Sequence, residues 1–178
     1  YLGIGLATYT EQTAHATAEF VRRGSPIILG YDAATVRMDP SGKVTVMASM
    51  QSHGQGLETT VAQLVADQLG VPLEDVAVLH GDSTLSPYGM GTFASRSAVL
   101  CGGAVQLAAG QVRAKLLRLA GHLLEAQPED LELADGVCRV RGVPARAMTI
   151  RELARIAYHR VEKLPPGESI GLEATQAY

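Results

Sequence analysis

The sequence predicts an α+β fold in which a mixed sheet, built partly of β-hairpins, is covered by helices. Of the 178 residues, 47% are hydrophobic and 19% are charged, which excludes disorder and suits a compact domain. Apolar residues recur with a period of about 3.6 in two long stretches, and alternate with a period of two in several short ones. Most of the 19 glycines gather where these stretches meet, as expected of turns between elements.

The N-terminal third predicts a strand and a hairpin. Residues 2–10 alternate like a half-buried strand, with one face formed by Leu2, Ile4, Leu6 and Thr8. Residues 13–26 have no clear period and are expected to be irregular. Residues 34–48 contain two alternating runs around a turn with Pro40 and Gly42, which predicts a hairpin.

The rest of the chain alternates helices with short strands. A helix is expected at 57–69, ended by Gly70, followed by a buried strand at 75–80 and a long loop at 81–95. One long amphipathic helix is expected at about 97–126. Its first turns contain only small residues on one side, so another backbone is expected to pack closely there. A hairpin at 131–140 and a capped helix at about 150–160 complete the order.

Composition excludes several classes of protein. The net charge of −3 argues against general binding of nucleic acid or anionic membranes. No apolar stretch approaches the roughly 20 residues of a membrane span, so we expect a cytoplasmic protein. The two cysteines, Cys101 and Cys138, and the five histidines lack the spacing of a disulfide framework or a zinc site, and Cys101 is expected in the core. The ends of the sequence suggest a piece of a larger polypeptide.

Two glycine-rich junctions carry the strongest functional signal. Each leads into the start of a predicted helix, where free N–H groups and the helix dipole favour an anion. We call residues 52–57 the first junction and residues 89–97 the second junction. No acidic residue occurs between Asp82 and Glu125, whereas four basic residues do, which favours a phosphate or polyanion near the second junction.

Two other interpretations compete with anion binding. The sequence Gly81-Asp82-Ser83 resembles the start of one family of serine esterases, with Ser83 as nucleophile. Such a serine needs a histidine oriented by a carboxylate, and the late histidine, His159, lacks the acidic residue three positions before it. The chain could also be a non-catalytic α+β interaction module. A dinucleotide fingerprint at residues 89–94 is disfavoured because a loop, rather than a strand, precedes it.

The junctions resemble a known family when they are read together. Residues 51–60 (QSHGQGLETT), 81–83 (GDS) and 87–97 (PYGMGTFASRS) resemble the large, molybdopterin-binding subunit of molybdenum hydroxylases. This is the family of xanthine dehydrogenase, aldehyde oxidase and carbon monoxide dehydrogenase. The likeness runs along nearly the whole chain, so residues 1–178 are expected to be part of a molybdopterin-binding domain within a larger subunit.

The resemblance implies a molybdopterin cofactor with molybdenum, often carried as the cytosine dinucleotide. It assigns cofactor binding to the first junction through Gly54, Gln55 and Gly56. It assigns the same role to the second junction through Gly91, Thr92, Phe93, Ala94, Ser95 and Ser97. His53 stands where many members have Gly or Gln. In the family the pterin dithiolene holds the metal, so no metal ligand is expected among these residues.

The resemblance also implies what the chain lacks. The family oxidises an aldehyde, an N-heterocycle or a similar small substrate, with water as the source of oxygen. Its glutamate base belongs to a G-x-G-E motif that does not occur here, so no catalytic residue is expected in this chain and the chain alone is expected to be inactive. The expected partners are the rest of the large subunit and the domains or subunits that carry iron-sulfur clusters and FAD. Nucleic acid and membrane are not expected as partners.

Overall fold

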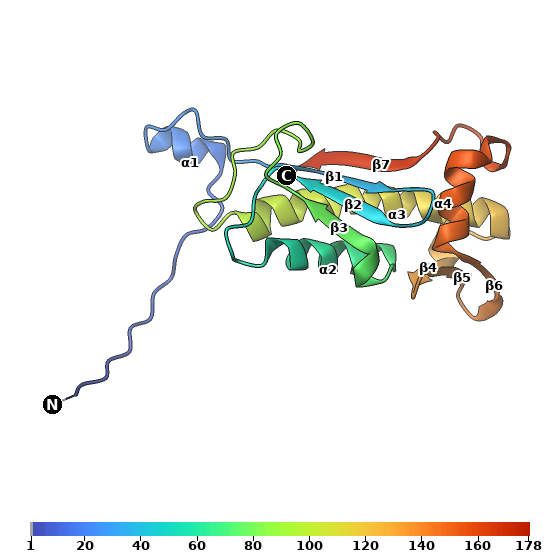
Figure 1. The fold of residues 1–178 in the computed structure, drawn as a ribbon, viewed down its shortest axis with the longest axis horizontal. Coiled ribbons are helices and arrows are strands. Elements are labelled where there is room, and N and C mark those ends of the chain that lie inside the picture. The colour runs from blue at the N-terminus through green and yellow to red at the C-terminus, as the bar shows by residue number, and fades with distance from the viewer. Residues whose placement is uncertain (1) are drawn as a thin grey trace.

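The structure is a computed structural model that describes residues 2–178 (Figure 1). Its centre is a four-stranded mixed sheet with the order β3-β2-β1-β7. Strands β1 (Ala33–Met38), β2 (Val44–Ala48) and β7 (Leu172–Ala177) pair antiparallel, and β3 (Val76–Leu79) runs parallel to β2. Helices α2 (Leu57–Leu69) and α3 (Gly102–Leu124) pack on one face of this sheet (Figure 1). The buried side chains of the core lie between the helices and the sheet.

The β1–β2 hairpin confirms the predicted one. Alternate residues such as Val36 and Val46 are fully buried and face each other in the register. At the turn, the Asp39 carboxylate accepts hydrogen bonds from the backbone and the hydroxyl of Ser41, and Gly42 adopts a φ of +86°. The local sequence therefore fixes both the turn and the face that is buried.

Helix α2 (Leu57–Leu69) has the predicted bounds. It is flanked by Gly56 and Gly70, whose φ values of +76° and +68° lie in the left-handed region that favours glycine. Both ends of the helix are therefore set by local sequence.

The long helix is also confirmed, over residues 97–124. A π-helical turn (Ser97–Cys101) leads into α3 (Gly102–Leu124). The expectation that another backbone packs against its small residues is wrong, because the close neighbour of Gly103 is the ring of Tyr178. Strand β7, which the sequence did not predict, brings that ring to the helix.

A second sheet stands at the end of the molecule away from the loop at 81–95 (Figure 1). It is antiparallel with the order β4-β5-β6 and contains the predicted hairpin, β4 (Leu131–Ala134) and β5 (Val137–Val140). Strand β6 (Val143–Thr149) leads into α4 (Ile150–His159) through the predicted capping box of Thr149 and Glu152. The predicted α+β class, with a mixed sheet, hairpins and covering helices, is therefore confirmed, and the strands are divided between two sheets.

Three further expectations need correction. Residues 2–10 are extended and exposed, and they pair with no strand in the described part of the chain (Figure 1). The segment 13–26, expected to be irregular, contains helix α1 (Thr17–Arg22), which buries Phe20. Strand β3 is alternately half-buried and exposed rather than buried, because it forms an edge of the sheet.

Candidate functional site

The second junction contacts the chain immediately before the first junction. The Thr92 hydroxyl donates a hydrogen bond of 2.5 Å to the backbone carbonyl of Gln51, just before the first junction. A Cβ atom on Gly89 would collide with the side chains of Ser49 and Asp32, so glycine alone allows this approach. The two residues in this hydrogen bond, Gln51 and Thr92, are 41 positions apart in the sequence.

A cleft of about 340 Å³ opens between residues 49–51 and residues 81–91. Its lining includes Gly89 and Gly91 of the second junction and no described residue of the first junction. Hydroxyl groups line much of it, and one of them, Ser86 Oγ, is buried without a hydrogen-bond partner among the described residues. The one charged group in its wall is Asp82, whose carboxylate accepts hydrogen bonds of 2.6 and 2.8 Å from Thr84. The bond from the Thr84 hydroxyl is the main reason that the pKa of Asp82 lies below its ordinary value. The lining of the cleft therefore offers neutral hydrogen-bonding groups and one carboxylate, and it contains no cation.

The first junction is an exposed turn held by its own groups. The side-chain oxygen of Gln55 accepts a hydrogen bond of 2.8 Å from the backbone N–H of His53. That bond orients the carboxamide and leaves its NH2 group for a ligand. His53 therefore stabilises this turn through its backbone N–H rather than through its ring. Gly54 has a φ of +107° and no atom near its Cβ position, so here glycine is required by the backbone conformation alone.

The start of helix α2 carries its own negative charge. Its N-cap residue, Gly56, has no side chain to cap the first turn, but Glu58 lies within that turn. Hydrogen bonds from its own backbone N–H and from the His80 ring hold the pKa of the Glu58 carboxyl below its ordinary value. The expected anion site at this helix start is thus partly occupied by a carboxylate of the same chain.

The second junction contains a strained turn. Ala94 and Ser95 have φ values of +51° and +50°, which cost on the order of 1–3 kcal/mol for each such residue. The turn is held by the rest of the chain: Ala14 N–H donates to Ala94 O at 3.2 Å, and the Phe93 ring lies between Phe20 and a guanidinium group. Such strain persists only where the surrounding structure enforces it.

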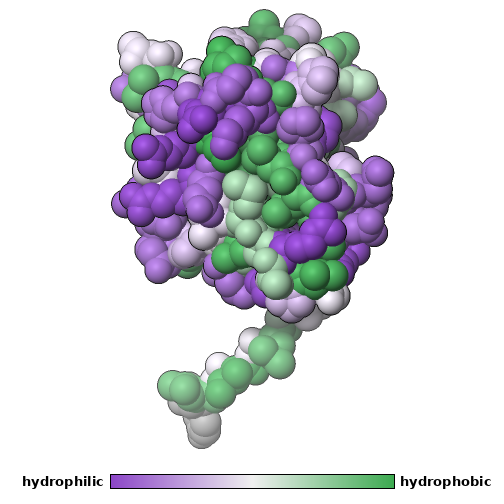
Figure 2. Space-filling model, turned by 90° about the vertical axis from the view of Figure 1, so that its right-hand side faces the viewer, coloured by the Kyte–Doolittle hydropathy of each residue, from purple (hydrophilic) through white to green (hydrophobic). Residues whose placement is uncertain are grey.

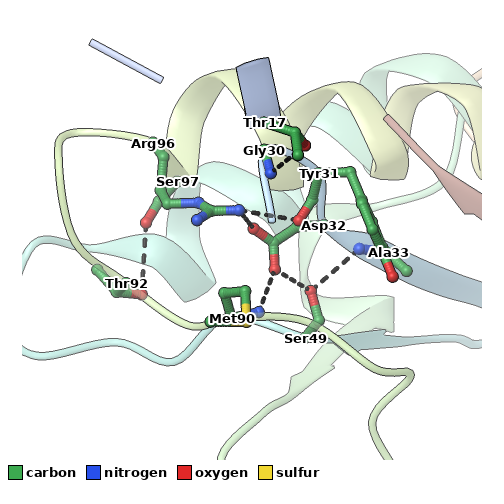
Figure 3. A network of polar contacts seen from close by, with 10 residues as sticks. All are labelled: Thr17, Gly30, Tyr31, Asp32, Ala33, Ser49, Met90, Thr92, Arg96 and Ser97. Carbon is green, nitrogen blue, oxygen red and sulfur yellow. Dashed lines mark hydrogen bonds and ion pairs between the residues drawn. The ribbon is translucent and has the colours of Figure 1, made fainter. Parts of the chain in front are cut away.

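That guanidinium belongs to Arg96, which forms a buried ion pair with Asp32 (Figure 3). The exposed fractions of the two side chains are 1% and 0%, and Arg96 Nη2 lies 2.5 Å from Asp32 Oδ2. The other carboxylate oxygen accepts hydrogen bonds from Ser49 Oγ at 2.9 Å and from the Met90 backbone N–H at 3.2 Å. One carboxylate therefore ties together the start of β1, the end of β2 and the second junction (Figure 3).

Sequence reasoning missed this pair. Arg96 is one of the four basic residues that favoured an anion near the second junction, because no acidic residue lies near it in the sequence. In the structure Asp32 is brought to it from 64 positions away. Its Nε and Nη1 atoms are buried without a partner in the described part of the chain, while Phe93 covers the guanidinium at 4.7 Å. No local pattern around Asp32 signals this contact.

The basic residues of α3 also have partners within the chain. Arg113 donates to the backbone carbonyl of Gln68 at 2.8 Å, and Arg118 forms an ion pair of 2.7 Å with Glu168, which Lys115 also approaches. The acid-free stretch of sequence is thus not acid-free in space. Any anion bound at the second junction would be held by N–H and hydroxyl groups rather than by these cations.

The alternative chemistries find no support. Ser83 lies in the loop at one end of the molecule, whereas His159 ends α4 at the opposite end (Figure 1), so the hydrolase interpretation lacks its base. Both cysteines are buried, and burial raises the pKa of each thiol to about 11. Among residues 2–178, no cluster of three His, Cys, Asp or Glu side chains could hold a metal ion. Within the same range, no helix has the length and apolar character that a membrane crossing needs.

Comparisons with known proteins identify the family of the chain. A family model described as "Molybdopterin cofactor-binding domain" matches residues 1–178. The nicotine 6-hydroxylase large subunit of Paenarthrobacter nicotinovorans is 40% identical over 178 residues, which cover 100% of this chain and 22% of that protein. The carbon monoxide dehydrogenase large chain of Afipia carboxidovorans is 37% identical over 180 residues, covering 99% of this chain and 21% of that protein.

A solved structure extends the comparison to the fold. The quinoline 2-oxidoreductase of Pseudomonas putida 86 superposes with a TM-score of 0.85 at 47% identity, over 94% of this chain and 21% of that one. The chain thus spans about a fifth of the length of these relatives. The resemblance in the sequence is confirmed, and the chain belongs to the family of molybdopterin cofactor-binding domains.

Proposed function

We propose that residues 1–178 form part of a single cofactor-binding domain and build one wall of the molybdopterin site in a hydroxylase large subunit. The single observation that carries the proposal is the contact between the second junction and the residue just before the first, where the Thr92 hydroxyl donates a hydrogen bond to the backbone carbonyl of Gln51. The chain also contains features that fit a bound cofactor: an orphaned hydroxyl at Ser86 and a carboxamide NH2 group at Gln55.

The two junctions would make different contacts with the cofactor. At the first junction, Gln55 would donate from its NH2 group, while Gly54 and Gly56 hold the turn open. At the second junction, the helix beginning at Ser97 has no acidic residue in its first turn and no side-chain cap, so its N–H groups suit the anionic part of the cofactor. Residues there would act through their backbone, their hydroxyl groups or the anchoring of Phe93, and they are Gly91, Thr92, Phe93, Ala94, Ser95 and Ser97. Molybdenum on the bound pterin would supply the redox and oxygen-transfer chemistry.

The activity we propose for the whole subunit is oxidation of a small substrate with water as oxygen source. Support comes from relatives whose names describe hydroxylation of nicotine and oxidation of carbon monoxide or quinoline. We place the general base in the remainder of the subunit, since no glutamate of this chain lines the cleft. The partners we propose are iron-sulfur and flavin domains or subunits, and the compartment we propose is the cytoplasm.

The test compares Gln55→Ala with Gln63→Ala in the full-length large subunit. Gln63 is an exposed glutamine on α2 that belongs to neither junction, so it controls for loss of the side chain itself. We expect Gln55→Ala to weaken cofactor retention roughly tenfold, as loss of about one good hydrogen bond does, with little effect on the unfolding temperature. Molybdenum content measured by mass spectrometry and released pterin measured by fluorescence give the result. Full occupancy in Gln55→Ala would make Gln55 only a turn residue.

A further inference from the structure

Residues 2–10, which we call the arm, have the sequence of a strand but no partner. The side chains of Leu2, Ile4 and Leu6 are 97%, 93% and 99% exposed, and Gly3 and Gly5 have no atom near their Cβ positions. The arm stands clear of the body in two views and presents a hydrophobic surface (Figures 1 and 2). It contains no charged residue. Soluble proteins rarely leave such a segment uncovered, because its apolar side chains and its backbone both need partners.

The sheets of this chain do not supply that partner. Strands β3 and β7 form the two edges of the larger sheet, and the arm pairs with neither. The arm instead extends away from both sheets from its base beside α1 (Figure 1). At about 3.3 Å per residue the arm spans about 30 Å, which is more than the roughly 17–20 Å of a typical strand.

The base of the arm is attached to the second junction. Ser95 Oγ donates to Glu11 Oε2 at 3.4 Å, Ala14 N–H donates to Ala94 O, and the Phe20 ring packs at 6.1 Å from the Phe93 ring. The arm therefore leaves the chain beside the turn to which we assign cofactor binding. Segments from the remaining four-fifths of the subunit must converge at the same place if they complete that site.

We propose that the arm is a β-strand that adds to an open sheet edge in the part of the large subunit outside this chain, with Leu2, Ile4 and Leu6 facing its core. The identity of the partner rests on the proposed function, because that function places the rest of the subunit at the base of the arm. An uncharged strand with one apolar side fits a sheet edge next to an apolar layer. Once docked, the arm would also hold the strained turn at Ala94 and Ser95 through its contacts at the base.

Hydrogen–deuterium exchange of the full-length large subunit tests the proposal, with a synthetic peptide of residues 1–12 as reference. We expect the amides of the arm to exchange at least about a hundredfold more slowly in the subunit than in the peptide, as paired strands do. Exchange at the rate of the peptide would overturn the proposal. Protection that disappears when the subunit is diluted to a monomer would also overturn it, because it would assign the arm to a second copy.

Two matched variants test the orientation of the strand. Ile4→Asp places a charge on the apolar side, whereas Ala7→Asp places the same charge on the opposite side. We expect Ile4→Asp to lose most of the protection and Ala7→Asp to keep it, and equal loss in both would contradict one-sided burial. The same exchange measurement on Gln55→Ala separates the two proposals, because the arm should remain protected there even when molybdenum is lost.

Discussion

The two junctions reach the same region of the molecule by different physical means. The first junction is exposed, and its shape comes from the left-handed backbone of Gly54 and Gly56 and from a hydrogen bond between residues two apart, His53 and Gln55. The second junction rests on a buried ion pair and on rings supplied by distant segments. The comparison teaches that a glycine-rich motif can be a self-contained turn or can depend on the whole fold, and that the motif alone does not distinguish the two.

The largest effect is expected from removing the carboxylate that supports the second junction. Asp32→Ala leaves the Arg96 charge buried without a counter-ion, so we expect the free energy of unfolding to fall by about 3–5 kcal/mol. Urea unfolding of the purified 178-residue chain measures it. Glu19→Ala, which removes exposed ion pairs with Arg22 and Arg23, is the control and should change little. Equal effects of the two substitutions would show that the buried pair does not support the fold.

A pair of glycine substitutions compares the cost of an added Cβ atom at the two junctions. Gly89→Ala forces a Cβ against the side chains of Ser49 and Asp32, and we expect it to cost up to about 3 kcal/mol and to separate the junctions. Gly54→Ala meets open space, so we expect a loss of about 1 kcal/mol from its positive φ alone. Urea midpoints at constant slope give both values. A larger cost at Gly54 than at Gly89 would reverse our assignment of close approach to the second junction.

A smaller effect concerns Cys101, which lies in the core near the second junction. Burial, with a further contribution from the Asp32 charge, raises the pKa of this thiol to about 11. A raised pKa means that the folded chain holds the proton more tightly, so this contribution is complete below the ordinary thiol pKa and is lost as the pH rises from about 9 to 11. We expect a loss of about 2 kcal/mol by pH 11.

Urea unfolding of the 178-residue chain at pH 8, 9.5 and 11 measures that loss. Cys101→Ala should show a correspondingly weaker decline over the same range, since it removes the titrating group. Cys138, whose pKa is also raised to about 11, remains as an internal reference in that variant. An unchanged alkaline decline in Cys101→Ala would contradict the assignment.

Elements whose signals are local could be predicted from the sequence. The hairpin at Asp39–Gly42 and the bounds of α2 follow from turn residues, capping glycines and apolar periodicity within a few residues of each position. The capping box of Thr149 and Glu152 follows in the same way. The resemblance of the junctions to molybdenum hydroxylases was equally a property of short motifs, which the family match confirms.

Contacts that join distant segments became known from the folded structure alone. The pairing of β7 with β1, the division into two sheets and the partnership of Asp32 with Arg96 all connect residues far apart in the chain. Residues 2–10 show the same limit from the other side, because their alternation predicts a strand while the described chain supplies no strand beside them. The physical reason is that a strand and a buried charge each need a partner, and a local pattern states the need without naming the partner.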